Sequence, residues 1–169
     1  MNESQMTLGS DYHAGIDPTG WLVSEKLNGC RAFWDGSQFW TRGGNVIAAP
    51  DWFTDGLPTV PLDGEIWAGR GRFEEARLAV QFGHWTRRCR FVAFDAPKAR
   101  GTWQRRMATA GRLWRYTVAF EVCQGHGWLM ERLRTVQSVG GEGLVIRNPK
   151  VSRYETGVTA NLLKVKKLI

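Results

Sequence analysis

The chain has 169 residues, of which 43% are hydrophobic and 23% are charged. This length suits one domain, and this composition excludes a largely disordered chain. No apolar run approaches the roughly 20 residues that a membrane-spanning helix needs, and the polar first residues lack the basic and apolar regions of a secretory signal. Lysine and arginine total 23 against 16 acidic residues, and the net charge of +7 favours a polyanionic partner such as nucleic acid. A basic surface without any partner is the alternative.

Composition also bears on where the protein works. The three cysteines, Cys30, Cys89 and Cys123, are too few and too widely spaced for a disulfide framework or a zinc site. Reduced thiols in the cytoplasm are the simplest interpretation. No linker, repeat or low-complexity tract divides the sequence, so we expect a monomer with a single domain over residues 1–169 and a loop-rich lead-in at 1–16.

The predicted elements, in chain order, are mostly short strands. Strands are expected at 21–25, 30–35, 38–42, 62–67, 90–94, 116–122, 143–147 and 162–166. Helical spacing predicts helices at 72–82, 102–114 and 128–139. Strands outnumber helices and do not alternate with them as in a βαβ repeat, which indicates an α+β fold with antiparallel sheets.

A predicted hairpin is the first informative site, because Asp35, Gly36 and Ser37 connect two alternating strands. If Gly36 and Ser37 form the turn, the register places Arg31 directly opposite Arg42. Like charges directly across a sheet are unfavourable. An anion between them would remove the penalty, and a phosphate with bidentate guanidinium contacts fits. A turn slipped to Asp35 and Gly36 would separate the arginines, and turn chemistry alone does not decide between the two registers.

Lys26 ends an apolar predicted strand and precedes Leu27, Asn28 and Gly29. Poor hydration at the strand end and the two nearby arginines both disfavour the protonated amine, and a neutral amine is a nucleophile. Taken alone, a lysine before a glycine turn is more often a solvated strand end. The catalytic interpretation therefore depends on the rest of the sequence.

Two acidic motifs suggest a metal site. Alternation places Asp63 and Glu65 on the same face of a predicted strand, and Glu142 lies between Gly141 and Gly143, which let a ligand come close. Carboxylates near phosphate-binding cations are typical of a Mg²⁺ site, in which one or two acids share the ion with substrate oxygens. Each motif alone is more often an ordinary strand-end or loop acid.

One aromatic residue and two lysines complete the candidate site. Phe94 lies at the end of a predicted strand, where a ring can stack on a purine, although a core phenylalanine is commoner. Lys164 and Lys166 alternate onto one face of the last strand, where paired ammonium groups suit a phosphate. A solvated basic tail is the alternative for these lysines.

The order of these motifs resembles the five successive motifs of the covalent nucleotidyltransferases, the superfamily of ATP-dependent DNA ligases, RNA ligases and mRNA capping enzymes. The five are KLNGCR at 26–31, LDGE at 62–65, FVAFD at 91–95, EGLVIR at 142–147 and LKVK at 163–166. Four further segments are similar to the minimal ATP-dependent DNA ligases of bacteria and phages: SEK at 24–26, AFWDG at 32–36, AAPDWF at 48–53 and GRGRF at 69–73. The resemblance extends over residues 17–167, nearly the whole chain.

This resemblance implies two antiparallel β-sheets flanked by helices, an ATP-grasp-like adenylation domain that holds ATP between the sheets, and a cellular role in DNA repair, replication or recombination. It implies that Lys26 attacks the α-phosphate of ATP to form lysyl-AMP, that AMP passes to the 5′-phosphate of a nick in duplex DNA, and that a 3′-hydroxyl then displaces AMP. The other implied roles are nucleotide binding by Glu25, Arg31, Glu65, Phe94, Lys164 and Lys166, contact with the nick 5′-phosphate by Arg42, and Mg²⁺ binding by Glu65 and Glu142.

The sequence departs from the ligase pattern in two ways. Asn28 stands where DNA ligases usually carry Asp, so a hydrogen-bonding carbonyl remains but its negative charge is lost. The chain ends at Ile169 without the C-terminal OB-fold that ligases usually carry. Three interpretations remain open: a naturally trimmed enzyme, an isolated catalytic domain, or one half of a split enzyme that works with an OB-fold domain or protein in trans. The alternatives are an RNA ligase, which Asn28 favours, and a degenerate nick-binding module without chemistry. The acidic motifs argue against the second alternative, since binding alone would not need them.

Overall fold

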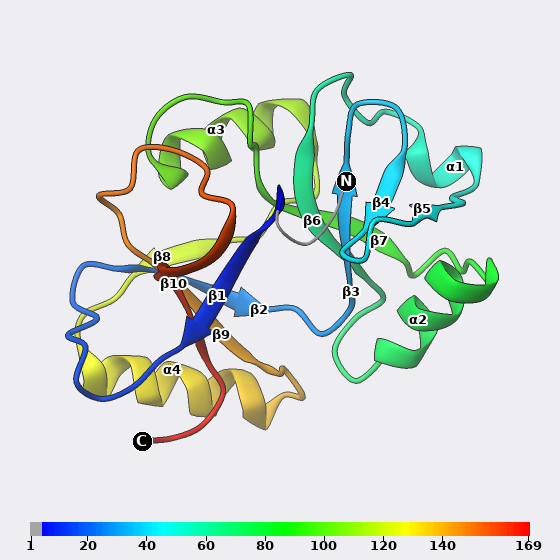
Figure 1. Cartoon of the computed structure of the whole chain (residues 1–169). Coiled ribbons are helices and arrows are strands. Elements are labelled where there is room, and N and C mark those ends of the chain that lie inside the picture. The colour runs from blue at the N-terminus through cyan, green and yellow to red at the C-terminus, as the bar shows by residue number, and fades with distance from the viewer. Residues whose placement is uncertain (1–4) are drawn as a thin grey trace.

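The computed structural model describes residues 5–169, and these form two five-stranded sheets with helices packed on their outer sides (Figure 1). Sheet A has the strand order β1-β10-β9-β2-β8 and sheet B the order β5-β4-β3-β6-β7. Every neighbouring pair is antiparallel except β1 and β10, which run parallel. The predicted α+β class with two sheets is confirmed.

The strands of sheet A are β1 (Thr7–Asp11), β2 (Leu22–Lys26), β8 (Phe120–Val122), β9 (Gly143–Arg147) and β10 (Gly157–Val165). Those of sheet B are β3 (Cys30–Trp34), β4 (Phe39–Thr41), β5 (Val46–Ile47), β6 (Leu62–Trp67) and β7 (Arg90–Asp95). The helices are α1 (Asp51–Thr54), α2 (Phe73–Phe82), α3 (Trp103–Leu113) and α4 (His126–Ser138). No helix among residues 5–169 is long and apolar enough to cross a bilayer.

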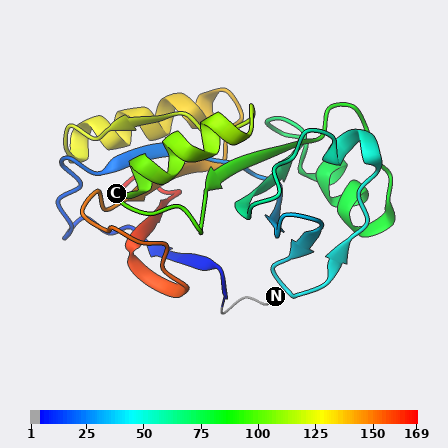
Figure 2. The same ribbon diagram turned by 90° about the horizontal axis from the view of Figure 1, so that it is seen from above.

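Each sheet buries one face against helices, and α3 contacts both sheets, since its Trp103 clusters with Leu22 of β2 and packs against Phe94 of β7. α4 packs on β9 of sheet A, α2 packs on β3 and β6 of sheet B, and α3 packs on β7. Viewed from above, the sheets lie in separate lobes, and α3 and α4 cover the same side of the molecule (Figure 2). The faces that the helices leave open lie on either side of a cleft between the two sheets.

Alternation along β6 decides which of its side chains reach that middle region. Leu62 and Ile66 are fully buried in the core beneath α2. Glu65 and Trp67 point to the opposite face and line clefts between the sheets. Because successive side chains of a strand alternate between faces, the same pattern that builds the core delivers Glu65 to the cleft, whereas Asp63 on the same face is fully buried.

The predicted hairpin register is confirmed. Asp35 donates its backbone N–H to the carbonyl of Gln38 at 3.1 Å, and Ala32 pairs with Thr41. The Asp35 carboxylate accepts the backbone N–H of Ser37 at 2.8 Å, which fixes the turn at Gly36 and Ser37. Continued by one residue, this register places Arg31 opposite Arg42, as expected.

The prediction of a loop-rich lead-in at 1–16 is wrong for residues 7–11, which form β1; residues 1–4 lie outside the described part of the chain. β1 lacks an alternating apolar pattern, and its partner β10 is nearly the whole chain away. The predicted strand at 116–122 is shorter, as β8, and the last strand begins at Gly157 rather than at residue 162. Two short elements, β5 and α1, were not predicted.

Candidate active site

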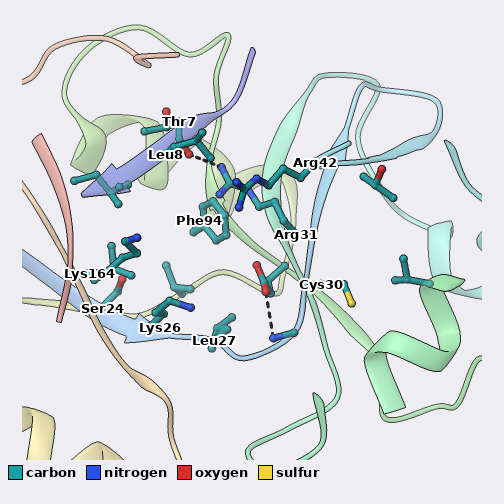
Figure 3. Close-up of a pocket in the computed structure, with 18 of the residues that line it drawn as sticks. Thr7, Leu8, Ser24, Lys26, Leu27, Cys30, Arg31, Arg42, Phe94 and Lys164 are labelled. Carbon is teal, nitrogen blue, oxygen red and sulfur yellow. Dashed lines mark hydrogen bonds between the residues drawn. The ribbon is translucent and has the colours of Figure 1, made fainter. Parts of the chain in front are cut away.

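A cleft of about 990 Å³ lies between the two sheets. It gathers seven of the residues that the sequence singles out, from five different strands and the loop after β4: Glu25, Lys26, Arg31, Arg42, Glu65, Phe94 and Lys164. Figure 3 shows Lys26 and Lys164 extending from the sheet A side, with Arg31, Arg42 and Phe94 across from them. The remaining two, Glu142 and Lys166, do not line the cleft. Glu142 contacts Lys26, and Lys166 contacts Glu142.

Lys26, at the end of β2, is ion-paired. Its Nζ donates to Oε2 of Glu142 at 2.6 Å, and Lys166 Nζ lies 3.1 Å from Oε1 of the same carboxylate. Partial burial alone would raise the pKa of Glu142, but hydrogen bonds and charge attraction from the two lysines outweigh it and lower that pKa. The contact is a salt bridge that orders the Lys26 side chain beside a carboxylate. A lysine nitrogen can attack only after it has lost its proton.

Glu65 is held where the chain crosses from β2 to β3. Its Oε1 accepts the backbone N–H of Gly29 at 3.1 Å, and a side chain at Gly29 would collide with the Ile66 carbonyl. Burial raises the pKa of Glu65 to about 7, although the charges of Arg31 and Lys26 oppose the shift. This carboxyl therefore changes charge near neutral pH.

The guanidinium of Arg31 is paired with a carboxylate of the protein, that of Asp63. Its Nε and Nη2 donate to the two carboxylate oxygens of Asp63, each at 2.7 Å, from the neighbouring strand β6. The charge of Asp63 raises the pKa of Arg31 above its ordinary value, against the opposing effect of burial. The expectation that a bound phosphate relieves the repulsion between Arg31 and Arg42 is thus wrong in part, since a buried carboxylate of the chain compensates Arg31.

Phe94 lines the cleft, and two guanidinium groups lie close to its ring. The guanidinium of Arg31 lies 4.6 Å from the ring centroid, and that of the buried Arg147 lies 5.9 Å away. Both contacts are within cation–π range. A purine that stacks on Phe94 must therefore use ring surface that these guanidinium groups leave open.

The two predicted lysines reach different partners. Lys164, in β10, pairs with Asp11 at 3.2 Å, whereas Lys166, just beyond the strand, pairs with Glu142. Glu25 faces two chambers of the inter-sheet space and is held by Arg70, whose Nε and Nη2 donate to its oxygens at 2.8 and 2.7 Å. Arg70 belongs to the GRGRF segment, which gave a resemblance but no role for this arginine.

A magnesium site would draw on few protein ligands. Residues 5–169 contain no group of three or more His, Cys, Asp or Glu side chains that could hold a metal ion. Glu142 contacts Lys26 at 2.6 Å, and the carboxylate of Glu65 interacts with the charge of Lys26. One or two carboxylates with substrate phosphate oxygens are what Mg²⁺ usually takes, so the donor set fits an ion that arrives with a nucleotide.

A lysine that ends a strand lies in a cationic cleft between two sheets, with carboxylates on two sides, and this is the arrangement that the nucleotidyltransferase motifs of the sequence predict. Comparison with known proteins agrees. No protein-family model matches the chain. The chain is 33% identical over 156 residues to a DNA ligase of Haemophilus influenzae, a match that covers 87% of this chain and 58% of that relative.

Solved structures give the same answer. A Lig E DNA ligase superposes with a TM-score of 0.86 at 34% identity, covering 96% of this chain and 68% of that one. Chlorella virus DNA ligase-adenylate superposes with a TM-score of 0.81 at 20% identity, covering 97% and 67%, and so shares the fold. This chain belongs to the DNA ligase family. It spans little more than half the length of the Haemophilus relative.

Proposed function

We propose that the protein is the catalytic core of an ATP-dependent DNA ligase, with Lys26 as the residue that becomes adenylated. The observation that carries this proposal is the contact between Lys26 Nζ and Glu142 at 2.6 Å, where Lys26 lines a cleft together with cationic side chains and the ring of Phe94. Motifs at the two ends of the chain converge on this one amine. A module that only bound nicked DNA would have no use for a lysine paired to a glutamate at the base of a cleft.

In the proposed reaction the Lys26 ammonium first loses a proton, and Glu142, 2.6 Å away, is the carboxylate placed to accept it. The bond from Nζ to the α-phosphorus of ATP then forms while the bond to the bridging oxygen breaks, and pyrophosphate leaves with that electron pair. Arg31 and Lys164, both in the cleft, would offset charge on the phosphate oxygens. Transfer of AMP to the 5′-phosphate of a nick, held at Arg42, and displacement by the 3′-hydroxyl would complete sealing.

Glu65 and Glu142 would hold Mg²⁺ together with phosphate oxygens, and the ion would supply further charge neutralisation. Glu25 and Phe94 would contact the adenine, and Lys166 would join Lys164 at the α-phosphate. We further propose that the protein acts as a monomer in the cytoplasm and that an OB-fold domain or protein assists it on nicked duplex DNA.

Mass spectrometry tests the proposal directly. Incubation with ATP and Mg²⁺ is expected to add one adenylate to the wild type but none to Lys26→Ala. Lys150→Ala is the matched control, because Lys150 is exposed and outside the cleft. Nicked DNA and nicked RNA duplexes are then compared as substrates. A wild type that stays unmodified and also fails to seal pre-adenylated nicks would overturn the proposal.

A further inference from the structure

A closed ring of hydrogen bonds ties the two sheets together at one end of the cleft. On sheet B, Arg31 donates to both oxygens of Asp63 at 2.7 Å. Tyr154, in the loop between β9 and β10, donates its hydroxyl to Oδ2 of Asp63 at 2.6 Å. The backbone N–H of Thr7, in β1, donates to the Tyr154 hydroxyl at 3.0 Å, and the Thr7 carbonyl accepts Nη2 of Arg31 at 3.1 Å.

The members of this ring depend on one another for their hydrogen bonds, because the ring is largely buried. The Asp63 side chain has 0% exposure, so its negative charge depends entirely on protein partners. Burial, followed by the charge of Asp63, raises the pKa of Tyr154 well above its ordinary value, so its hydroxyl remains a proton donor. No buried side-chain nitrogen or oxygen atom among residues 5–169 lacks a hydrogen-bond partner. Turning any one member of the ring would leave a buried polar atom unpaired.

The ring also decides which part of Arg31 a substrate can use. Asp63 and Thr7 occupy Nε and Nη2, and Nη1 donates to no residue within 5–169. The guanidinium plane is held over Phe94 at 4.6 Å. Arg31 nevertheless lines the cleft, so its Nη1 edge is the donor that remains for a bound anion.

We propose that Tyr154 is a positioning residue for Arg31: it fixes Asp63 from the sheet A side, so that Nη1 of Arg31 is presented to a phosphate of the bound nucleoside triphosphate. This inference rests on the proposed function. Tyr154 lies outside every motif that the sequence analysis used, and its loop reaches Asp63 across 91 residues of sequence. Because the phosphate charge is present before reaction, the effect falls mainly on nucleotide binding.

The test compares two tyrosine substitutions that make the same chemical change. Tyr154→Phe removes the hydroxyl and keeps the ring. Tyr12→Phe is the control, because its hydroxyl also makes two internal contacts, at 2.9 Å to His126 and 3.1 Å to the Ile16 carbonyl, outside the cleft. Both are expected to melt cooperatively at similar temperatures. In self-adenylation, KM for ATP should rise about tenfold in Tyr154→Phe with kcat changed less than threefold, and neither should change in Tyr12→Phe.

A double-mutant cycle then separates positioning from a general structural role. In an Arg31→Lys background, Tyr154→Phe is expected to raise KM no further, because the guanidinium fork that it orients is gone. An unchanged KM in the single variant, or an equal rise in both backgrounds, would overturn the inference.

A second measurement does not depend on catalysis. The Arg31 Nε–H proton, assigned in NMR spectra by its loss in Arg31→Lys, should exchange with solvent faster in Tyr154→Phe than in wild type or Tyr12→Phe. Equal exchange in all three overturns the inference even if the wild type is never adenylated, whereas missing adenylation with normal exchange differences counts only against the proposed function.

Discussion

One carboxylate holds two lysines: Glu142 accepts Lys26 Nζ at 2.6 Å on one oxygen and Lys166 Nζ at 3.1 Å on the other. The Lys26 and Glu142 side chains keep 23% and 22% of their exposure, so solvent and substrate can reach the pair. Glu142 therefore holds the Lys26 amine in an ordered position and lies between it and the positive charge of Lys166. This arrangement leads to the first prediction.

Glu142→Gln keeps the shape of the side chain but removes its charge, its proton-accepting ability and one metal ligand. We expect the rate of adenylate formation to fall about 100-fold or more, the usual effect of removing one preorganised charged group. The rate is measured as the growth of the adenylated mass. Glu131→Gln, an exposed glutamate on α4, controls for the loss of one acidic residue, and equal rates for the two variants would contradict the role of Glu142.

The pKa of Glu65 makes stability depend on pH. Its folded-state pKa of about 7 lies above the ordinary value of 4.5, because burial disfavours the charged form. The folded chain therefore binds this proton more tightly than the unfolded chain. Its stabilising contribution is fully present below pH 4.5 and is lost as the pH rises through about 7.

Urea unfolding at pH 5 and pH 8 measures this effect. Relative to Glu65→Gln, which has no proton to lose, the wild type is expected to lose about 2.5 kcal/mol in free energy of unfolding between the two conditions, at ~1.36 kcal/mol per pKa unit. If the variant and the wild type change in parallel, Glu65 does not titrate in this range. Adenylation should rise with pH over the same interval, since a metal ligand must be deprotonated.

Local patterns predicted the hairpin and β6 well, because turn chemistry and alternation involve neighbouring residues. The candidate lysines, acids and arginines were found for the same reason: they lie at strand ends within short motifs. The partners of these residues were not predictable. Asp63 was noted as an acid but not as the partner of Arg31, since nothing local indicates that β3 and β6 are neighbours. Tyr154 and Arg70 have partners 91 and 45 residues away.

Asn28 is where sequence and structure lead to different expectations. The sequence pattern gives this position weight because ligases usually carry Asp there. In the structure Asn28 is exposed and is not among the residues that line the cleft, although Leu27 and Gly29 are. A charge at this position would remain in solvent.

Asn28→Asp is therefore expected to leave adenylation and the preference between DNA and RNA nicks within about threefold of wild type, and the free energy of unfolding within ~0.5 kcal/mol, as for other surface changes. Initial rates on matched nicked duplexes and a urea titration give both values. A rate increase of tenfold or more would show that the missing charge does limit the site.

The last prediction contrasts two arginine–carboxylate pairs that differ in burial. Arg106 donates to Asp95 through Nε at 2.6 Å and Nη2 at 3.0 Å, with side-chain exposures of 5% and 9%, and this pair ties α3 to β7 directly after Phe94. Arg70 makes the same bidentate contact with Glu25, but its side chain is 40% exposed. Removing one partner of a buried pair leaves a buried charge uncompensated and costs ~3–5 kcal/mol, whereas an exposed pair contributes ~1 kcal/mol or less.

Arg106→Gln is thus expected to lower Tm by roughly 10 °C and Arg70→Gln by no more than about 4 °C, as measured by calorimetry at neutral pH. Equal shifts in Tm for the two variants would mean that burial does not set the strength of these pairs. The position of Phe94 would then depend on the packing of Trp103 against sheet A rather than on the Arg106–Asp95 pair.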